Sequence, residues 1–379
     1  MNEIGALVEK YNIYNGKMAV QRLNESCPVA MVTPGFSPER IIDLSKNDPG
    51  ALLKSTLIWE CLACGLCRQL TDGKVDMSRF IREVRIHAAA GGYFGTETHG
   101  GLLMSVQRIN ATPTLHPKRT DWITKPLRVV HGKGKYLYWV GGAPFFSAVM
   151  PEPGSAALDS ARAAILLLNH LGVKPVVLED ERFSGHDLLW TGNKEGFLAL
   201  ARKNLKAIMG SGADVVIVSS PEDYYTLGRS YREYCGNFDF EVCHITEFIA
   251  KHLDRLKFRE WKKRVTYHDP CRLGRGMGIY DAPREILMAI PGIELVEMKN
   301  TRELSLCCGT SCWINCNRYS KMMQVNRLHE AAATGAEILI TTCWECAIHF
   351  YCAIRPEAWR QVSMDIKDLV TMAASLSLE

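Results

Sequence analysis

Several features that would assign this 379-residue chain to a common class are missing from its sequence. The two most apolar stretches are too short or too interrupted to cross a bilayer: AAILLLNHLGVKPVVL and GADVVIVSS. The first residues, MNEIGALVEKYN, lack the basic and then apolar pattern of a signal peptide. No run of Lys and Arg is dense enough to follow a phosphate backbone, and the net charge of +4 is mild. We therefore expect a cytoplasmic protein that has no transmembrane segment and binds no nucleic acid.

Cysteine, in contrast, is abundant. The chain has 14 cysteines in a composition otherwise typical of soluble globular proteins, with 47% hydrophobic and 23% charged residues. A reducing compartment keeps thiols free, so a disulfide framework is excluded there, and clustered thiols usually bind metal. Most of these cysteines fall into two spaced patterns, and the length predicts two or three domains.

Five cysteines belong to neither pattern, and their role is left open by the sequence. Free cysteine often behaves as a small apolar core residue, so we expect buried packing for these five. Cys312 follows Cys308 by four positions on a predicted helix, which makes it a candidate for facing a metal site. The five are Cys235, Cys243, Cys312, Cys316 and Cys352.

The first pattern is the run WECLACGLC, which contains Cys61, Cys64 and Cys67. Bacterial iron–sulfur motifs continue this C-x2-C-x2-C spacing with x3-C-P, and the fourth cysteine binds the other cluster of a pair. Here Thr71 occupies the fourth position. Upstream, NESCP supplies Cys27, followed by proline as at the end of an earlier motif of the same kind.

The missing cysteines of these two motifs are complementary. By the motif spacing, one cluster would need positions 17, 20, 23 and 71, which hold Lys17, Val20, Leu23 and Thr71. The other cluster needs 27, 61, 64 and 67, and all four positions are cysteine. The sequence therefore predicts a single cubane [4Fe–4S] cluster on Cys27, Cys61, Cys64 and Cys67.

Zinc on the same four thiols is the alternative, because Zn²⁺ also accepts four cysteines. It is less favoured because zinc sites more commonly use two separated C-x2-C pairs. The flanking segments 37–61 and 76–92 are predicted to be helical. Ser37 and Pro38 provide a cap and a first-turn residue, and glycines follow the second segment.

The second pattern has the spacing C-x35-CC-x34-C-x2-C and comprises Cys271, Cys307, Cys308, Cys343 and Cys346. Predicted strands at 265–268, 293–298 and 337–342 alternate with predicted helices at 282–290 and 317–335. This alternation indicates a parallel sheet, and each cysteine group lies at or after the carboxyl end of a strand, where open α/β sheets bind ligands. Five converging thiolates exceed the four ligands of a zinc ion and favour a polynuclear cluster.

An internal repeat precedes this pattern. Residues 202–225 align with 325–348 at an offset of 123, and this alignment pairs Gly212 with Gly335 and Ser220 with Cys343. The same offset pairs Asp223 with Cys346, and a one-residue gap brings the FSG of 183–185 onto the CCG of 307–309. The first copy lacks all five thiols, so we expect it to complete the shape without binding the same cluster.

The doubled cysteine and its long spacings resemble the CCG-domain family, which includes the B-type and D-type components of heterodisulfide reductase. The fusion of a helical module to tandem repeats is similar to the D-type component. This resemblance implies an α-helical ferredoxin-like domain at 1–128 with one cubane cluster, followed by two tandem α/β CCG repeats with parallel sheets. The repeat at 129–256 would be degenerate, and the domain at 257–379 would bind a noncubane [4Fe–4S] cluster through Cys271, Cys307, Cys308, Cys343 and Cys346.

The resemblance implies an oxidoreductase subunit that is not catalytic in isolation and passes electrons between the cubane and noncubane clusters. The chain shows no flavin or nicotinamide fingerprint. We therefore expect other redox subunits, namely flavin or iron–sulfur proteins of the heterodisulfide reductase A-like type, in a hetero-oligomer. Similar subunits occur in electron-bifurcating assemblies, sulfur-metabolising complexes and class II benzoyl-CoA reductases of anaerobes. Partner identity, direction of electron flow, terminal substrate and any membrane association through another chain stay open.

Two other functions compete with this one. A catalytic thiol–disulfide reductase of the heterodisulfide type would act at the CCG cluster, although the empty first motif counts against it. A zinc-organised scaffold without a redox role is the third possibility.

Residues around the second pattern extend the site. His268 and Asp269, just before Cys271, would hydrogen-bond a cluster sulfur or supply a proton, or else only shape a turn. Arg272 and Arg275 would raise the reduction potential of an anionic cluster. Trp313 and Trp344 would shield it from water, with ordinary packing as the alternative.

Overall fold

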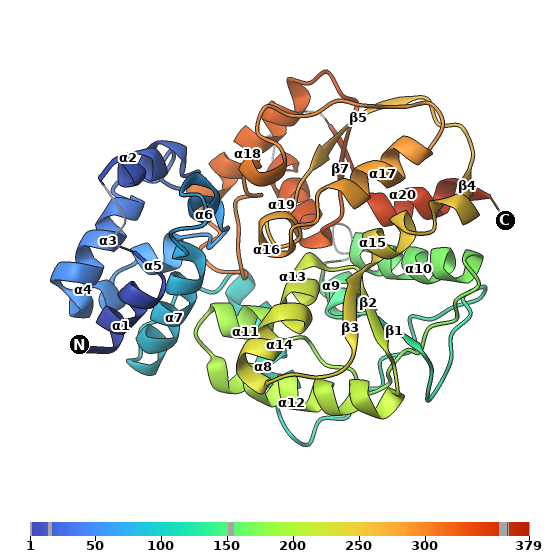
Figure 1. The fold of residues 1–379 in the computed structure, drawn as a ribbon, viewed down its shortest axis with the longest axis horizontal. Helices are drawn as coiled ribbons and strands as arrows, with labels where there is room; N and C mark the ends of the chain where they lie inside the picture. The colour runs from blue at the N-terminus through green and yellow to red at the C-terminus, as the bar shows by residue number, and fades with distance from the viewer. Residues whose placement is uncertain (1, 14–16, 151–154, 356–361, 363, 379) are drawn as a thin grey trace.

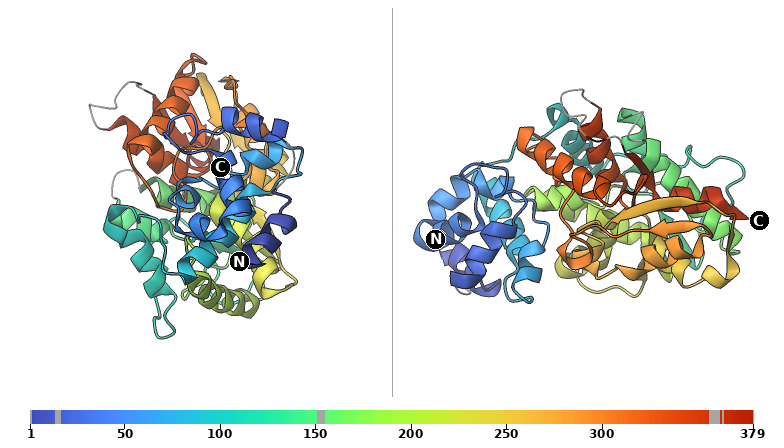
Figure 2. Two further views of the ribbon diagram at one scale, coloured as in Figure 1. Left: turned by 90° about the vertical axis from the view of Figure 1, so that its left-hand side faces the viewer. Right: turned by 90° about the horizontal axis from the view of Figure 1, so that it is seen from above.

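The N-terminal part of the chain is helical. The computed structural model describes residues 2–13, 17–150, 155–355, 362 and 364–378. The helical part lies at one end of an elongated molecule (Figures 1 and 2). Its elements are α1 (Asn2–Lys10), α2 (Lys17–Ser26), α3 (Pro38–Asn47), α4 (Pro49–Lys54), α5 (Leu57–Glu60), α6 (Leu66–Leu70) and α7 (Met77–Ala90). The 3-10 turn η1 (His99–Gly101) and α8 (Leu102–Asn110) follow, and α8 packs beside the helices of the first α/β unit (Figure 1).

Local sequence explains where these helices begin. The side chain of Ser37 accepts a hydrogen bond from the backbone of Arg40 and caps α3, which carries proline in its first turn. Asp76 caps α7 in the same way, by accepting from the backbone of Arg79. The helical prediction for 37–61 and 76–92 is confirmed, with breaks that divide the first segment into α3, α4 and α5.

The first α/β unit contains a parallel sheet in the order β1-β2-β3. Its strands are β1 (Tyr136–Trp139), β2 (Val215–Val218) and β3 (Glu241–His244). The accompanying elements are α9 (Ala143–Val149), α10 (Ser155–His170), α11 (His186–Trp190), α12 (Lys194–Ser211), α13 (Pro221–Tyr225), the π-helical turn η2 (Thr226–Ser230), α14 (Tyr231–Cys235), α15 (Ile245–Ala250) and the 3-10 turn η3 (Leu253–Arg255).

The second α/β unit contains a parallel sheet in the order β6-β5-β7-β8. A short antiparallel pair, β4 with β9, lies beside it. The elements are β4 (Lys257–Phe258), β5 (Lys263–His268), α16 (Gly274–Met277), α17 (Asp281–Ala289), β6 (Ile293–Leu295), the 3-10 turn η4 (Arg302–Leu304), α18 (Arg318–Ala332), β7 (Ile338–Thr341), α19 (Trp344–Ile354), β8 (Asp365–Asp368), α20 (Leu369–Leu376) and β9 (Ser377–Leu378). The three strands and two helices predicted here are confirmed within a few residues.

The two units repeat each other in the alignment predicted from the sequence. Strand β7 follows β2 by the same 123 positions along the chain. Gly212 and Gly335 both adopt left-handed backbone angles after the preceding helix, with φ of 65° and 71°. Gly185 and Gly309 are also left-handed, with φ of 86° and 88°.

The two units pack against each other. Helix α10 of the first unit packs against α20 of the second, and α15 packs against α17 (Figure 1). The interior strands are apolar, as in a sheet covered on both faces: Val216, Ile217, Leu339 and Ile340 are fully buried. Among the described residues, no helix combines the length and apolar character needed to span a membrane.

The predicted helix at Cys312 is wrong. Cys312 and Trp313 lie in a turn, and both have a φ of 54°. The backbone N–H of Thr98 donates to the carbonyl of Trp313 at 2.8 Å, and Asn315 donates in turn to the carbonyl of Thr96 at 2.8 Å. These bonds to the distant segment 96–98 replace the local bonds that a helix would make.

Candidate metal centres

Four cysteines of the helical part surround one apolar cavity. We call Cys27, Cys61, Cys64 and Cys67 the four-thiol group. Cys27 follows α2, Cys61 follows α5, and Cys64 and Cys67 lie in the next turn and in α6. The cavity is lined by all four and by apolar side chains that include Leu23, Phe36 and Ile41. Burial, together with the neighbouring Cys61 and Cys64, raises the pKa of Cys27 to about 12. Burial also holds the pKa of Cys67 well above its ordinary value.

Two positions that lack an expected cysteine have packing roles instead. Leu23 is almost fully buried and lines the four-thiol cavity. Thr71 donates its hydroxyl proton to the carbonyl oxygen of Cys67 at 2.8 Å and accepts from the backbone of Val75 at 3.1 Å. The side chains of Lys17 and Val20 lie outside what the structure describes.

Five cysteines of the second unit form another group. We call Cys271, Cys307, Cys308, Cys343 and Cys346 the five-thiol group. Cys271 follows β5, Cys307 and Cys308 lie in the loop before α18, and Cys343 and Cys346 begin α19. All are buried except Cys271, which is partly buried. The parallel sheet thus brings together thiols from three loops, each beyond the carboxyl end of a strand.

The five thiols approach one another in a chain. Contacts run from Cys271 to Cys307, from Cys307 to Cys308, and from Cys308 through Cys346 to Cys343. Cys308 accepts from two of these neighbours, which lowers its pKa to about 6. The Sγ atom of Cys343 also caps α19 by accepting from the backbone of Cys346 at 3.3 Å. At the equivalent place in the first unit, the hydroxyl of Ser220 accepts from the backbone of Asp223 at 3.2 Å.

The donor sets fit iron–sulfur clusters. Four cysteines around one cavity match the ligand set of a cubane cluster, and zinc would accept them too. Five thiols that approach one another in a chain exceed the coordination of one zinc ion and fit a polynuclear centre.

Two arginines connect the thiol groups. Arg272 donates from Nη1 to the carbonyl oxygen of Ala63 at 3.0 Å, and Arg275 donates from Nε to that of Cys64 at 2.8 Å. Both arginines closely follow Cys271 in the sequence. The guanidinium of Arg272 lies 3.7 Å from the ring centroid of Trp190, a favourable cation–π distance. The arginines predicted near the second group therefore also hold the loop of the first.

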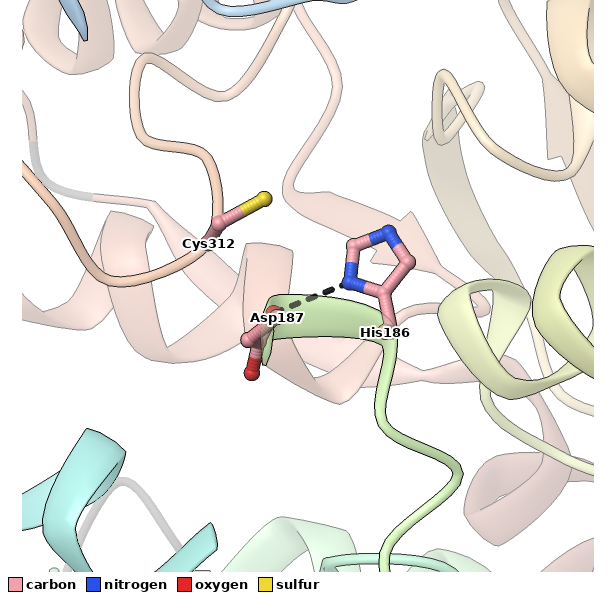
Figure 3. A group of neighbouring side chains, drawn as sticks. All are labelled: His186, Asp187 and Cys312. Atoms are coloured by element: carbon pink, nitrogen blue, oxygen red, sulfur yellow. Dashed lines mark hydrogen bonds and ion pairs between the residues drawn. The ribbon is translucent and has the colours of Figure 1, made fainter. Parts of the chain in front are cut away.

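The first unit contributes a polar cluster that was not predicted from the sequence. His186 and Asp187 begin α11, directly after Gly185, and lie beside Cys312 (Figure 3). All three are buried, and their potential ligand atoms lie within 4.8 Å of one another. His186 Nδ1 lies 2.9 Å from Asp187 Oδ1, and its Nε2 accepts from Arg272 Nε at 3.1 Å. Both ring nitrogens therefore have partners, and Nδ1 is the donor toward Asp187.

Two buried carboxyl groups of the first unit lie in the region that corresponds to Cys343 and Cys346, and Asp223 occupies the position of Cys346. Glu222 and Asp223 begin α13, and Glu222 Oε2 lies 3.5 Å from the Sγ of Cys343. Burial raises the pKa of Glu222 to about 7 and that of Asp223 to about 6. The alignment of Asp223 with Cys346 in the sequence could have predicted the carboxyl group at position 223. Nothing in the sequence indicated that Glu222 would face a thiol.

His268 and Asp269 lie at the end of β5, as expected, but their contacts are structural. Asp269 pairs with Arg284 at 2.7 Å and accepts from the backbone of Arg302 at 2.8 Å. Arg327 donates from Nε to His268 Nδ1 at 3.2 Å. These contacts favour the turn-forming interpretation for Asp269, whereas His268 Nε2 is buried without a hydrogen-bond partner among the described residues and the role predicted for His268 stays a prediction. Instead, His349 lies next to a thiol, with Nδ1 3.3 Å from the Sγ of Cys308.

The remaining predicted residues have mixed outcomes. Trp313 and Trp344 are buried and pack on Phe146, with ring centroids 5.0 and 4.6 Å from it. Cys243 is buried in the apolar core as expected, and Cys235 and Cys352 are half-buried. Cys316 is exposed, so the prediction of buried packing is wrong there. It lies in the same loop as Cys312, and the backbone of this loop bonds to residues 96–98 instead of forming a helix.

Comparison with known proteins agrees with this architecture. The CCG cysteine-rich domain matches residues 155–228 and 265–351, which confirms the predicted repeat. The chain resembles the D component of the dihydromethanophenazine:CoB–CoM heterodisulfide reductase of Methanosarcina mazei. The two are 29% identical over 332 residues, which cover 84% of this chain and 78% of that one.

Two further proteins are similar to this chain, one in sequence and one in fold. A probable iron–sulfur-binding oxidoreductase of Bacillus subtilis is 26% identical, covering 80% of this chain and 44% of that one. A crystal structure of a hypothetical protein from Helicobacter pylori shares the fold with a TM-score of 0.57 and 11% identity, covering 98% of this chain and 76% of that one. Residues 155–228 and 265–351 therefore match the CCG cysteine-rich domain, and the chain as a whole is similar in sequence to the D component of heterodisulfide reductase and to related iron–sulfur oxidoreductases.

Proposed function

We propose that this chain is an iron–sulfur electron-transfer subunit of a multi-subunit redox complex of the heterodisulfide reductase type. The four-thiol group would hold a cubane [4Fe–4S] cluster, and the five-thiol group a noncubane [4Fe–4S] cluster. When bound, such clusters supply one-electron carriers, with potentials of about −700 to +450 mV among iron–sulfur proteins. The observation that carries the proposal is the gathering of nine of the 14 cysteines into two neighbouring groups.

The chain's own residues would fix and tune these centres. Arg272 and Arg275 hold the backbone of the four-thiol loop next to the five-thiol loop, which keeps the distance between the groups constant. Their positive charges stabilise the extra negative charge of a reduced cluster, so they would raise the reduction potentials of both centres. Trp313 and Trp344 exclude water beside the five-thiol group, and lower solvent exposure also changes the potential.

The relatives support a place in a larger assembly. They include subunits named for heterodisulfide reductase, for fumarate reductase (CoM/CoB), and an EtfAB:quinone oxidoreductase. We propose partner subunits that carry flavin or iron–sulfur groups and exchange electrons with this chain. We further assign a ferredoxin-like character to the helical part and domain limits at 1–128, 129–256 and 257–379.

Metal analysis of anaerobically purified protein tests the proposal. Two clusters predict about eight iron atoms and matching labile sulfide per chain. Cys67→Ser and Cys346→Ser should each remove the electron paramagnetic resonance signal of one centre and leave the other. Cys235→Ser lies outside both groups and serves as the matched control. A colourless protein that contains zinc and no iron would refute the proposal.

Catalytic thiol–disulfide reduction is the second candidate. The position of Cys271 favours it, because this residue is incompletely buried and lines a cavity through which a substrate sulfur could approach the five-thiol group. The first unit counts against it, since Ser220 and Asp223 occupy the positions of Cys343 and Cys346. Turnover of a disulfide by the isolated chain with a reduced viologen donor would establish this activity, and its absence from iron-replete protein would exclude it.

A further inference from the structure

A cavity of about 310 Å³ lies between the two thiol groups. Cys64 of the four-thiol group and Cys271 of the five-thiol group both line it. Cys271 is the partly buried member of its group, and the other four are buried. A molecule in this cavity would therefore lie beside one thiol of each group. The volume is at the lower end of the range for small-molecule sites.

The lining of this cavity is strongly basic. Two acidic side chains line it, Asp76 and Glu233, and both already have partners. Glu233 pairs with Arg79 at 2.9 Å and with Arg82 at 2.8 Å. Asp76 accepts from the backbone of Arg79 at 3.1 Å. The basic lining residues are Arg68, Arg79, Arg229, Arg232, Arg272 and Arg275.

Two of these arginines have a donor without a partner. The Nη2 atoms of Arg272 and Arg275 are buried and make no hydrogen bond to the described residues. Arg272 is 5% exposed, and its other donors are fixed by His186 and Ala63. An unsatisfied buried donor costs free energy, so a ligand that accepts these hydrogen bonds would be stabilised.

Two further arginines are free for a ligand. Arg68 and Arg229 are exposed, and neither forms an ion pair within the part of the chain that the structure describes. Arg229 makes one weak contact, from Nε to the sulfur of Met277 at 3.3 Å. The cavity thus combines buried, pre-positioned guanidinium groups with movable ones.

We infer that this cavity binds a small organic anion through a terminal phosphate, sulfonate or carboxylate group. Arginine suits this task because its planar donors match such oxyanions in pairs. The role of the anion as an electron donor or acceptor rests on the proposed function, whereas its binding does not.

Calorimetric titration of the anaerobically purified full chain with inorganic sulfate, inorganic phosphate and succinate tests this inference. At low ionic strength we expect saturable binding to one site for at least one of the three. The double variant Arg68→Gln/Arg229→Gln should weaken it about tenfold or more, because two charge-assisted contacts are lost. Arg202→Gln, which removes an exposed arginine of α12 outside the cavity lining, should bind like the wild type.

The outcomes separate the ligand classes and the two proposals. Preference for sulfate or phosphate supports a tetrahedral oxyanion, and preference for succinate supports a carboxylate. No saturable binding of any of the three anions, or equal affinity in the double variant, would overturn the inference. Iron and sulfide are measured on the same samples. Anion binding by iron-free protein would support this inference while contradicting the proposed function.

Discussion

Among single residues, Arg85 connects the four-thiol loop to the first α/β unit. Its guanidinium is fully buried and donates to the carbonyl oxygens of Ile58, Trp59 and Cys61 in the helical part. It also donates to the carbonyl oxygen of Trp190 in the first α/β unit. One side chain thus satisfies acceptors from segments that are far apart in the sequence. The sequence places Arg85 on the predicted helix 76–92 but does not indicate its partners, because they depend on tertiary packing.

Replacing Arg85 by alanine should destabilise the fold. Four carbonyl oxygens lose their donor, and burial of unsatisfied polar groups costs about 3 kcal/mol or more in total. The midpoint of denaturant unfolding measures this loss. Arg202→Ala, at an exposed position, should change stability by less than about 0.5 kcal/mol. Equal stability of the two variants would contradict the role given to Arg85.

Glu181 predicts a pH dependence of stability. Burial raises its pKa to about 8, and its carboxylate accepts from the backbone N–H groups of Val140 and Gly141. The folded state therefore holds a proton that the unfolded state releases at lower pH, so Glu181 contributes a loss of stability as pH rises from about 4.5 to about 8.

The variant Glu181→Gln cannot ionise, so its thermal midpoint should fall less between pH 5 and pH 8 than that of the wild type. Thermal unfolding at pH 5, 6, 7 and 8 measures both slopes. A parallel pH dependence of the two proteins would show that Glu181 does not titrate in this range.

Among the elements, the loops between strand and helix determine which unit holds thiols. Gly185 and Gly309 turn the chain in the same left-handed conformation, yet the first is followed by His186 and the second by Thr310. The strands, helices and these turns could be predicted, since apolar runs, glycines and the repeat are local signals. The loop at Cys312 could not, because its hydrogen bonds go to residues 96–98. The carboxylate of Glu222, which faces Cys343, could not be predicted because the first copy lacks thiols and its packing on the second copy depends on tertiary structure.

A matched pair of variants tests the role of these loops. A Cβ at Gly309 would lie 2.9 Å from the carbonyl oxygen of Ser320, and one at Gly185 would lie 3.0 Å from the ring of Phe197. Gly309→Ala and Gly185→Ala should each destabilise the fold by about 1–3 kcal/mol. Gly309→Ala should also lower the iron bound at the five-thiol group, because Cys308 moves with the turn. Gly185→Ala should retain that iron, and equal iron loss in both would contradict a local effect.

Over the whole molecule, three parts meet around the five-thiol group. The helical part contributes Ala63 and Cys64 through the arginine contacts, the first unit contributes Glu222, and the second unit supplies the thiols. The two thiol patterns could be found in the sequence, because cysteine spacing is a specific signal. Their closeness could not, because it depends on how the helical part packs on the α/β units (Figure 2).

Diffraction from anaerobically grown crystals at the iron absorption edge tests the central claim most directly. The account predicts anomalous density for iron at two places, one among Cys27, Cys61, Cys64 and Cys67, and one among Cys271, Cys307, Cys308, Cys343 and Cys346. It predicts none beside Ser220 in the first unit. Iron at a single place, or peaks that appear only above the zinc edge, would contradict it.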